Sequence, residues 1–250
     1  MQRMVGSLSG GSRLSQTLTT RAVVVGLVAV LLTVFIVAWA ELVTGTIQIG
    51  FLQLPPVLVA LLFLLSVVNG VVGRYSPRHR LSARELVVVT CMMLMASMIT
   101  SRGLMEDLIP MQVGINYYAN PSNRWEETFY PYIKQWMVPW RVDRGALQDV
   151  AVDFYEGLKP GAPVPWRLWV VPTLTWLGLV GFVYAAFLAL SAFLQRLWAD
   201  HELLSFPLVQ LPLEMISAER SREFLRNPLM WLGLSVPLVV FGLNGLHEIW

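Results

Sequence analysis

Residues 22–40 read AVVVGLVAVLLTVFIVAWA, a run of nineteen residues without a charged side chain. As an α-helix rising about 1.5 Å per residue, this run would extend roughly 28 Å, close to the roughly 30 Å thickness of a bilayer's hydrocarbon core. The run therefore predicts a membrane-spanning helix. Its basic start and its Ala38-Trp39-Ala40 end are also typical of a signal peptide, although the usual apolar core of about 7–15 residues is shorter.

The composition of the whole chain agrees with a membrane protein. Of its 250 residues 56% are hydrophobic and 14% are charged, whereas a soluble domain carries about 25% charged residues. The net charge of +2 is too small to indicate nucleic-acid binding. Cys91 is the only cysteine, and no glycine-rich phosphate loop occurs, so we predict neither a disulfide nor a cofactor.

Further apolar runs extend the pattern and predict an all-α integral membrane fold in contact with the lipid bilayer. A tail over residues 1–21, rich in Ser, Thr and Gly, precedes them. We expect five transmembrane helices, over residues 22–43, 51–73, 85–101, 168–195 and 227–247.

Residues 102–167 differ from these runs because they are charged and rich in aromatic residues, as in NYYANPSNRWEETFYPYIKQWMVPW. So many charged side chains cannot cross the hydrocarbon core. Trp and Tyr favour the membrane interface, where the ring is buried and its polar tip stays hydrated. We therefore predict a folded external cap over this segment.

The arginines predict which side each segment occupies. The turn after the second run contains Arg74, Arg78, Arg80 and Arg84, and basic residues in short loops are retained on the cytoplasmic side. Alternating five spans then places the N-terminus inside and the cap outside. The predicted location is the cytoplasmic (bacterial inner) membrane.

The stretch HELLSFPLVQLPLEM, residues 201–215, contains two prolines that each remove a helical hydrogen bond. It is nevertheless too apolar for a free loop. We predict a Pro-broken or re-entrant segment over 201–217, with Gln210 and Glu214 facing a polar cavity, because irregular backbone at membrane depth must be buried or line a cavity. The alternative is an interfacial hairpin that lies flat on the membrane.

Glu41 follows directly on the first apolar run. A carboxylate at membrane depth costs about 2.5–3.5 kcal/mol on insertion scales, and such groups usually face protein, water or an ion pathway. Glu41 is therefore a candidate for a substrate or ion pathway. The alternative is an interfacial acid beside Trp39.

Other acids and histidines give weaker indications of chemistry. The pairs Glu106-Asp107 and Glu126-Glu127 resemble cation ligands but are more typical of solvated helix ends. His201-Glu202 does not match a helical zinc motif, because position 205 is Ser where a second His is needed, and His247-Glu248 lies at the chain end. We predict no metal site and no catalytic residue.

Three stretches, TTRAVVVGLVAVLLTVF, LLSVVNG and WADHELLSFPLVQLPLEM, are similar to the first part of oligopeptide-transporter-type proteins. The whole chain more closely resembles the N-terminal portion of large uncharacterised bacterial membrane proteins. The resemblance implies a polytopic carrier for proton-coupled uptake of peptides or metal chelates. It carries over Phe206, Pro207 and Glu214 as site residues, whereas Leu208, Val209 and the long cap depart from the pattern.

The leading functional hypothesis is a secondary transporter of this type, and an enzyme is the less favoured class. Alternatives are a membrane-embedded transferase for lipid-linked substrates and a non-catalytic assembly subunit. The last apolar run stops close to Trp250, so we expect a longer protein, whose missing C-terminal part or a partner helix bundle would complete the fold. A homo-oligomer is a further possibility.

Overall fold

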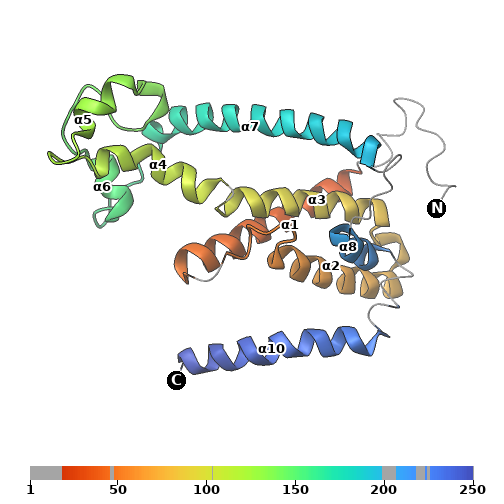
Figure 1. Ribbon diagram of the computed structural model, residues 1–250. Coiled ribbons are helices and arrows are strands. Elements are labelled where there is room, and N and C mark those ends of the chain that lie inside the picture. The colour runs from red at the N-terminus through yellow and green to blue at the C-terminus, as the bar shows by residue number, and fades with distance from the viewer. Residues whose placement is uncertain are drawn as a thin grey trace. The chain divides into compact units, whose positions relative to one another are not determined.

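The computed structural model describes residues 19–45, 48–102, 104–198, 207–217, 223 and 226–249 (Figure 1). These residues form helices and loops, with no strand among them. The long helices are α1 (Thr20–Ala38), α2 (Pro56–Tyr75), α3 (Ala83–Thr100), α7 (Trp166–Arg196) and α10 (Pro228–Ile249). The shorter ones are η2 (Trp39–Val43), η3 (Pro77–His79), α4 (Met105–Tyr117), α5 (Trp125–Thr128), η4 (Tyr130–Tyr132), η5 (Gln135–Met137), α6 (Asp149–Tyr155) and α8 (Pro207–Ile216).

Five helical stretches are long and apolar enough to cross a membrane, which confirms the all-α membrane fold. They are Thr20–Val43, Pro56–Tyr75, Ala83–Tyr117, Trp166–Gln195 and Pro228–Leu246. The chain divides into two compact units. The first comprises Met1–Arg102 and Phe206–Trp250, and the second comprises Gly103–Ser205.

The first unit is organised around the pairing of α1 with α3. The buried face of α1 is marked by residues spaced four, seven and four positions apart: Ala22, Gly26, Thr33 and Val37. Small side chains at this spacing let two helix backbones approach closely. A Cβ atom on Gly26 would overlap the Met92 side chain of α3. The buried Thr33 hydroxyl donates to the Ala29 carbonyl at 2.8 Å, so its polar group is satisfied within α1.

A second contact surface of the first unit joins α2, α3 and α8. Figure 1 shows α8 lying beside α2. The buried apolar side chains of this core are Leu58, Leu62, Leu81, Leu86, Val89, Met93, Met215 and Ile216. Because Met215 and Ile216 belong to α8, the end of that helix is held by the same core that holds α2 against α3.

The turn between α2 and α3 is fixed by a buried amide. Asn69 of α2 donates through Nδ2 to the Leu81 carbonyl at 3.0 Å and accepts from the Leu81 amide at 2.7 Å. One side chain therefore satisfies both backbone groups of Leu81. An orphaned backbone group at such a position would cost about 1–3 kcal/mol, so Asn69 determines the path of the turn.

Glu85 connects the start of α3 to the start of α1. Its carboxylate accepts from Arg21 Nη2 at 2.8 Å and from Thr19 Oγ1 at 2.6 Å. It also completes a capping box with Ser82, whose backbone N–H donates to Glu85 Oε2 at 2.8 Å. The Glu85 side chain is only 7% exposed, whereas the Arg21 side chain is 39% exposed, so the ion pair is buried on its acidic side and open to water on its basic side.

The second unit has a packed core among the residues predicted as a cap, 102–167, although the candidate span Ala83–Tyr117 overlaps the start of that range. Its core consists of Val113, Tyr130, Val138, Trp140, Val150 and Ala151. Trp140 Nε1 donates to the Gln112 carbonyl at 2.8 Å, which ties the loop after η5 to α4. Trp176 Nε1 of α7 donates to the Met137 carbonyl at 2.9 Å. The cap is thus anchored to the first turns of α7 by an indole hydrogen bond.

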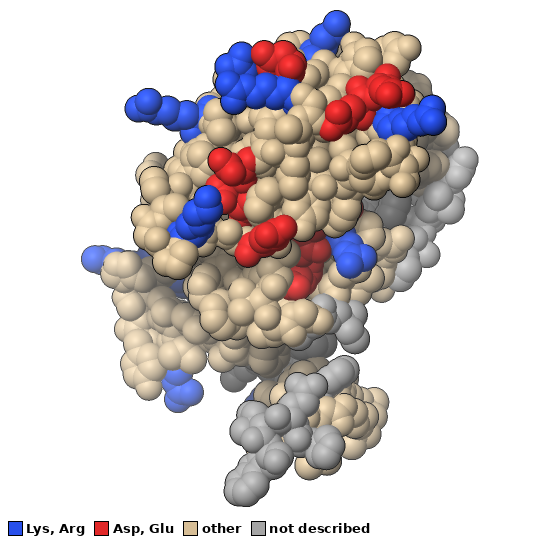
Figure 2. Space-filling model, turned by 90° about the vertical axis from the view of Figure 1, so that its left-hand side faces the viewer, with Lys and Arg blue, Asp and Glu red and all other residues tan. Residues whose placement is uncertain are grey.

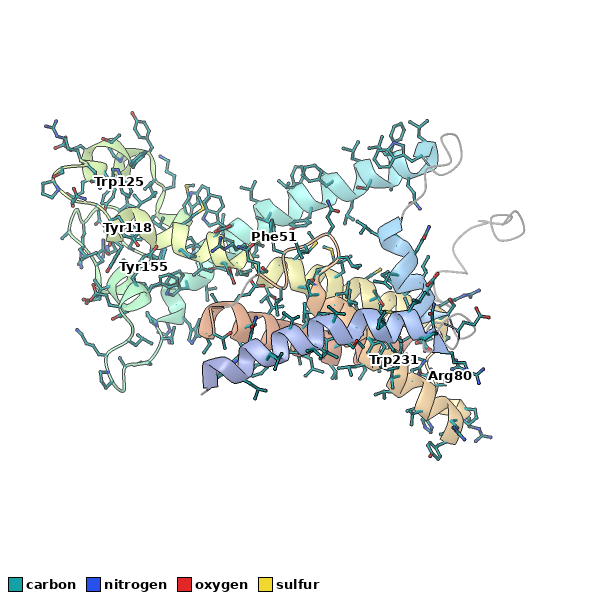
Figure 3. The ribbon with its side chains drawn as sticks, turned by 60° about the horizontal axis from the view of Figure 1, so that its bottom comes forward. Phe51, Arg80, Tyr118, Trp125, Tyr155 and Trp231 are labelled. Atoms are coloured by element: carbon teal, nitrogen blue, oxygen red, sulfur yellow. The ribbon has the colours of Figure 1, made fainter. Side chains whose placement is uncertain are left out.

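Aromatic rings and mixed charges make up much of the cap surface. Tyr118 and Tyr155 lie beside one another, with ring centroids 5.3 Å apart (Figure 3). Burial, together with the nearby phenols of Tyr118 and Tyr117, raises the pKa of Tyr155. Figure 2 shows acidic and basic side chains interspersed over the face in view, so no single sign of charge dominates there.

The buried Trp140 provides a test of the cap as a packed structure. Trp140 is 1% exposed, whereas Trp136 nearby is 50% exposed. We expect Trp140→Ala to lower the free energy of unfolding by about 3–5 kcal/mol, because a large buried side chain is removed. Trp136→Ala should change it by less than about 0.5 kcal/mol. Denaturant unfolding, monitored by protease susceptibility, measures the unfolding free energy of both variants. Equal effects of the two substitutions would show that the cap is not packed as described.

Candidate functional site

Glu41 lies in an irregular end of the first spanning helix. After Ala38 the helix widens into the π-helical turn η2 (Trp39–Val43), in which the Thr44 amide donates to the Trp39 carbonyl at 3.1 Å. π-helical turns are rare and often occur at functional sites. The wider turn sets the direction of the Glu41 side chain, which is partly buried.

The Glu41 carboxylate joins three segments of the first unit. Its Oε1 accepts from the Gly50 amide at 2.8 Å, and its Oε2 accepts from the Ser101 hydroxyl at 2.6 Å. Gly50 belongs to the segment that connects α1 to α2, and Ser101 directly follows α3. Both donors are electrically neutral, and Ser101 is completely buried. Two hydrogen bonds from neutral groups therefore hold the carboxylate.

Gly50 reaches Glu41 because it has no side chain. A Cβ atom at position 50 would lie 2.8 Å from the Ser97 carbonyl oxygen, 2.9 Å from Ser101 Cβ and 3.0 Å from Val37 Cγ1. These distances are shorter than real Cβ contacts, so any side chain here would push the connecting segment away. The chain thus passes back beside α1 and α3, at the level of Val37 and Ser97.

The connecting segment, residues 48–55, has irregular backbone although it lies against two spanning helices. Pro55 is extended, with φ −60° and ψ 133°, and the next residue is also proline, which disfavours helical backbone at position 55. α2 therefore begins at Pro56, five residues later than the predicted start at 51. Irregular backbone at membrane depth is tolerated where protein buries it or where it lines a cavity.

A second polar contact holds the same segment. When the Gln48 amide is oriented so that its oxygen faces Arg102, Gln48 Oε1 accepts from Arg102 Nη1 at 3.0 Å and from Arg102 Nε at 3.1 Å. Together with the Glu41 contacts, this pair fixes the segment to the C-terminal ends of α1 and α3. Glu41, Gln48, Gly50, Ser101 and Arg102 constitute the candidate site.

The predicted site around residue 210 has a different structure. Pro207 begins the ten-residue helix α8, and Pro212 lies inside it, so residues 207–216 are helical. A helix of ten residues extends about 15 Å, too short to cross the membrane alone. Gln210 and Glu214 are exposed, and the cavity beside α8 is lined by Ile216 instead. Their role on a pathway stays a prediction, and Phe206 lies outside the described residues.

The acidic pairs do not form a cation site. Glu106 and Asp107 lie in the first turn of α4, and Glu126 and Glu127 lie in α5. Within the part of the chain that the structure describes, no three His, Cys, Asp or Glu side chains come together in a group that could hold a metal ion. His201-Glu202 and the side chains of His247 and Glu248 lie outside the described residues.

A cavity of about 600 Å³ lies in the second unit, between α6 and the first turns of α7. Its lining is mostly apolar and includes Phe154, Trp166 and Trp169, with Asp153 as a charged residue at its wall. This volume suits a small apolar ligand. The cavity was not predicted from the sequence, because its wall combines residues from α4, α6 and α7.

Replacing Gly50 tests the close approach that forms the Glu41 site. We expect Gly50→Ala to lower the free energy of unfolding by about 1–3 kcal/mol, because the added methyl group forces the connecting segment off Glu41. Gly70→Ala is the matched control, since nothing lies within 4 Å of a Cβ there. Alanine at this helical position should be neutral or stabilising by up to about 1 kcal/mol. Thermal unfolding in detergent measures both; an unaffected Gly50→Ala protein contradicts the described contact.

Residues 12–250 match the model of a family of unknown function, DUF6785. No curated protein and no solved structure matches the chain. The match covers nearly all of the sequence, in agreement with the expected uncharacterised family. The chain therefore belongs to the DUF6785 family, whose function is unknown.

Proposed function

We propose that the protein is part of a secondary transporter in which Glu41 binds and releases the coupling proton. The observation that carries this proposal is the pair of neutral donors on a carboxylate at the end of a spanning helix, beside irregular backbone. Transporter sites commonly combine interrupted helices, freed backbone groups and an acid at membrane depth. The sequence resemblance to oligopeptide-transporter-type proteins adds that the solute is a peptide, a metal chelate or another small molecule.

The chemistry of the two donors supports a coupling role. A charged Glu41 accepts both hydrogen bonds, and hydrogen bonds to an ionised acceptor are roughly twice as strong as neutral ones. When Glu41 takes up a proton, it becomes a donor, and the Ser101 hydroxyl can rotate to accept that proton. The Gly50 amide then keeps only a weaker, neutral acceptor. Protonation would therefore loosen the connecting segment, which gives the proton a means to change the site's shape.

The arrangement of arginines supports a topology with the N-terminus inside. Arg21 and the turn from Arg74 to Arg84 lie at one end of the first unit, and Glu41 lies at the other end of α1. Under the positive-inside rule, the arginine end would face the cytoplasm. Glu41 and the connecting segment would then be near the outer surface of the cytoplasmic membrane.

One observation supports each of the two alternative functions, a membrane transferase and an assembly subunit. The apolar cavity of about 600 Å³ suits the lipid part of a lipid-linked substrate, as a membrane transferase would require. The Gly181, Ala185 and Ala189 face of α7 is exposed, and nothing lies within 4 Å of a Cβ at Gly181. That face suits a partner helix, from the rest of the protein, from a partner bundle or from a second copy.

Proton-coupled flux through the reconstituted full-length protein tests the proposal. With an imposed pH gradient and a panel of peptides and metal chelates, wild-type protein should carry protons together with a solute. Glu41→Gln should abolish the coupled flux while the protein stays folded, because the amide can still accept from Gly50 and donate to Ser101. Glu126→Gln, in the exposed cap, should leave the flux unchanged.

Two outcomes would redirect this proposal. Loss of flux in Glu214→Gln with full activity in Glu41→Gln would move the coupling site to α8. Absence of coupled flux with every solute of the panel, together with transfer activity toward a lipid-linked substrate, would favour the transferase.

Single cysteines test the proposed topology. In a Cys91→Ala background, Thr44→Cys marks the Glu41 end and His79→Cys marks the arginine end; both positions are exposed. A membrane-impermeant maleimide applied to intact cells should label position 44, and it should label position 79 only after the cells are permeabilised. The reverse pattern would place the N-terminus outside.

A further inference from the structure

Five arginines gather at one end of the first unit: Arg21, Arg74, Arg78, Arg80 and Arg84. Within the described part of the chain, only Arg21 has an acidic partner, Glu85, at 2.8 Å. Among the described residues, the other four form no ion pair and are exposed. This end of the unit therefore has an excess of positive charge that the described residues do not neutralise.

A cavity of about 300 Å³ opens among these arginines. Arg21, Arg80, Asn69 and Ser82 contribute polar groups to its wall, and Ile216 of α8 contributes an apolar one. Figure 3 shows Arg80 near the end of α2. The residues that line the cavity come from the start of α1, from α2 and from the start of α3, so the cavity lies where these three apolar helices meet a polar surface.

The position of Arg80 depends on Gly73. A Cβ at position 73 would lie 2.8 Å from Arg80 Cδ, so the Arg80 side chain packs directly on the α2 backbone. Arg21 fixes the backbone of the same turn, donating from Nη1 to the Arg78 carbonyl at 3.1 Å and from Nη2 to the Arg80 carbonyl at 2.7 Å. The guanidinium groups around the cavity are therefore attached to a well-defined backbone.

Glu85, the acid in the cavity wall, does not repel a bound anion. The Glu85 carboxylate is neutralised by Arg21 and also accepts from Thr19 and Ser82. The net charge of Arg21, Glu85 and Arg80 together is then positive. A phosphate group placed there would meet the Arg80 guanidinium, which presents a fork of donors suited to phosphate oxygens.

We propose that this cavity binds the phosphate headgroup of an anionic phospholipid. Basic pockets between membrane helices on the cytoplasmic side recognise such headgroups. The apolar wall at Ile216 and the exposed Tyr75 at the same end favour a phosphate that carries a lipid over free phosphate, because tyrosine favours the headgroup layer. This site is independent of Glu41 and of any transport activity.

The test measures the thermal unfolding midpoint of the full-length protein in detergent against added short-chain phosphatidylglycerol, phosphatidylcholine or inorganic phosphate. We expect phosphatidylglycerol to raise the midpoint saturably and phosphatidylcholine to have little effect. Arg80→Met keeps the aliphatic stem over Gly73 and should weaken the apparent affinity roughly fivefold, as expected for one arginine near an anionic headgroup. Arg144→Met, an exposed arginine of the second unit, is the matched control and should bind as wild type.

The remaining measurements distinguish recognition of the phosphate group from recognition of the whole lipid, and they exclude a folding defect. Displacement of the lipid by millimolar inorganic phosphate supports recognition of the phosphate group itself. Should Arg80→Met fail to fold, Gly73→Ala displaces Arg80 without removing its charge and should also weaken binding, whereas Arg80→Lys should retain part of it. Equal stabilisation by both lipids, or equal affinities of Arg80→Met and Arg144→Met, would overturn the proposal.

Discussion

A carboxylate at each end holds α1 against α3. At one end Glu85 of α3 binds Arg21 and Thr19 at the start of α1; at the other, Glu41 after α1 binds Ser101 after α3. Between these ends, the small residues on the buried face of α1 allow close contact but provide few directional interactions. The contacts at the two ends are directional, so they help to specify the register of α1 against α3.

The two carboxylates differ in what they bind, and the proposed coupling role of Glu41 rests on this difference. Glu85 is paired with a permanent cation, so protonating it would leave Arg21 without its counter-charge. Glu41 meets a hydroxyl and a backbone amide, and a hydroxyl can change from donor to acceptor by rotating its O–H bond. Glu85 is thus suited to a structural role, whereas the partners of Glu41 are compatible with the coupling role that we propose for it. The connecting segment 48–55 is held at Gly50 by the group that can change.

The sequence alone predicts the apolar helices and the aromatic cap, because these follow from runs of side chains with one character. It does not predict the contacts that join distant residues, such as Glu41 with Ser101 or Arg21 with Glu85. The irregular segment 48–55 is not predicted, because residues 51–55 carry no charge and therefore extend the second uncharged run. The signal was present in Pro55-Pro56, since a residue before proline disfavours helix. At Pro207, the same residue type starts a helix, where its missing N–H costs nothing.

The central claim is that the charge on Glu41 holds the connecting segment in place. Amide hydrogen exchange over residues 48–55, corrected for the intrinsic pH dependence of exchange, measures this directly. In the wild-type protein, protection of this segment should be high, because the Gly50 amide donates to the Glu41 carboxylate. In Glu41→Gln, measured at the same pH, protection should be markedly lower, because a neutral amide is a weaker acceptor. Equal protection in the two proteins would contradict the claim.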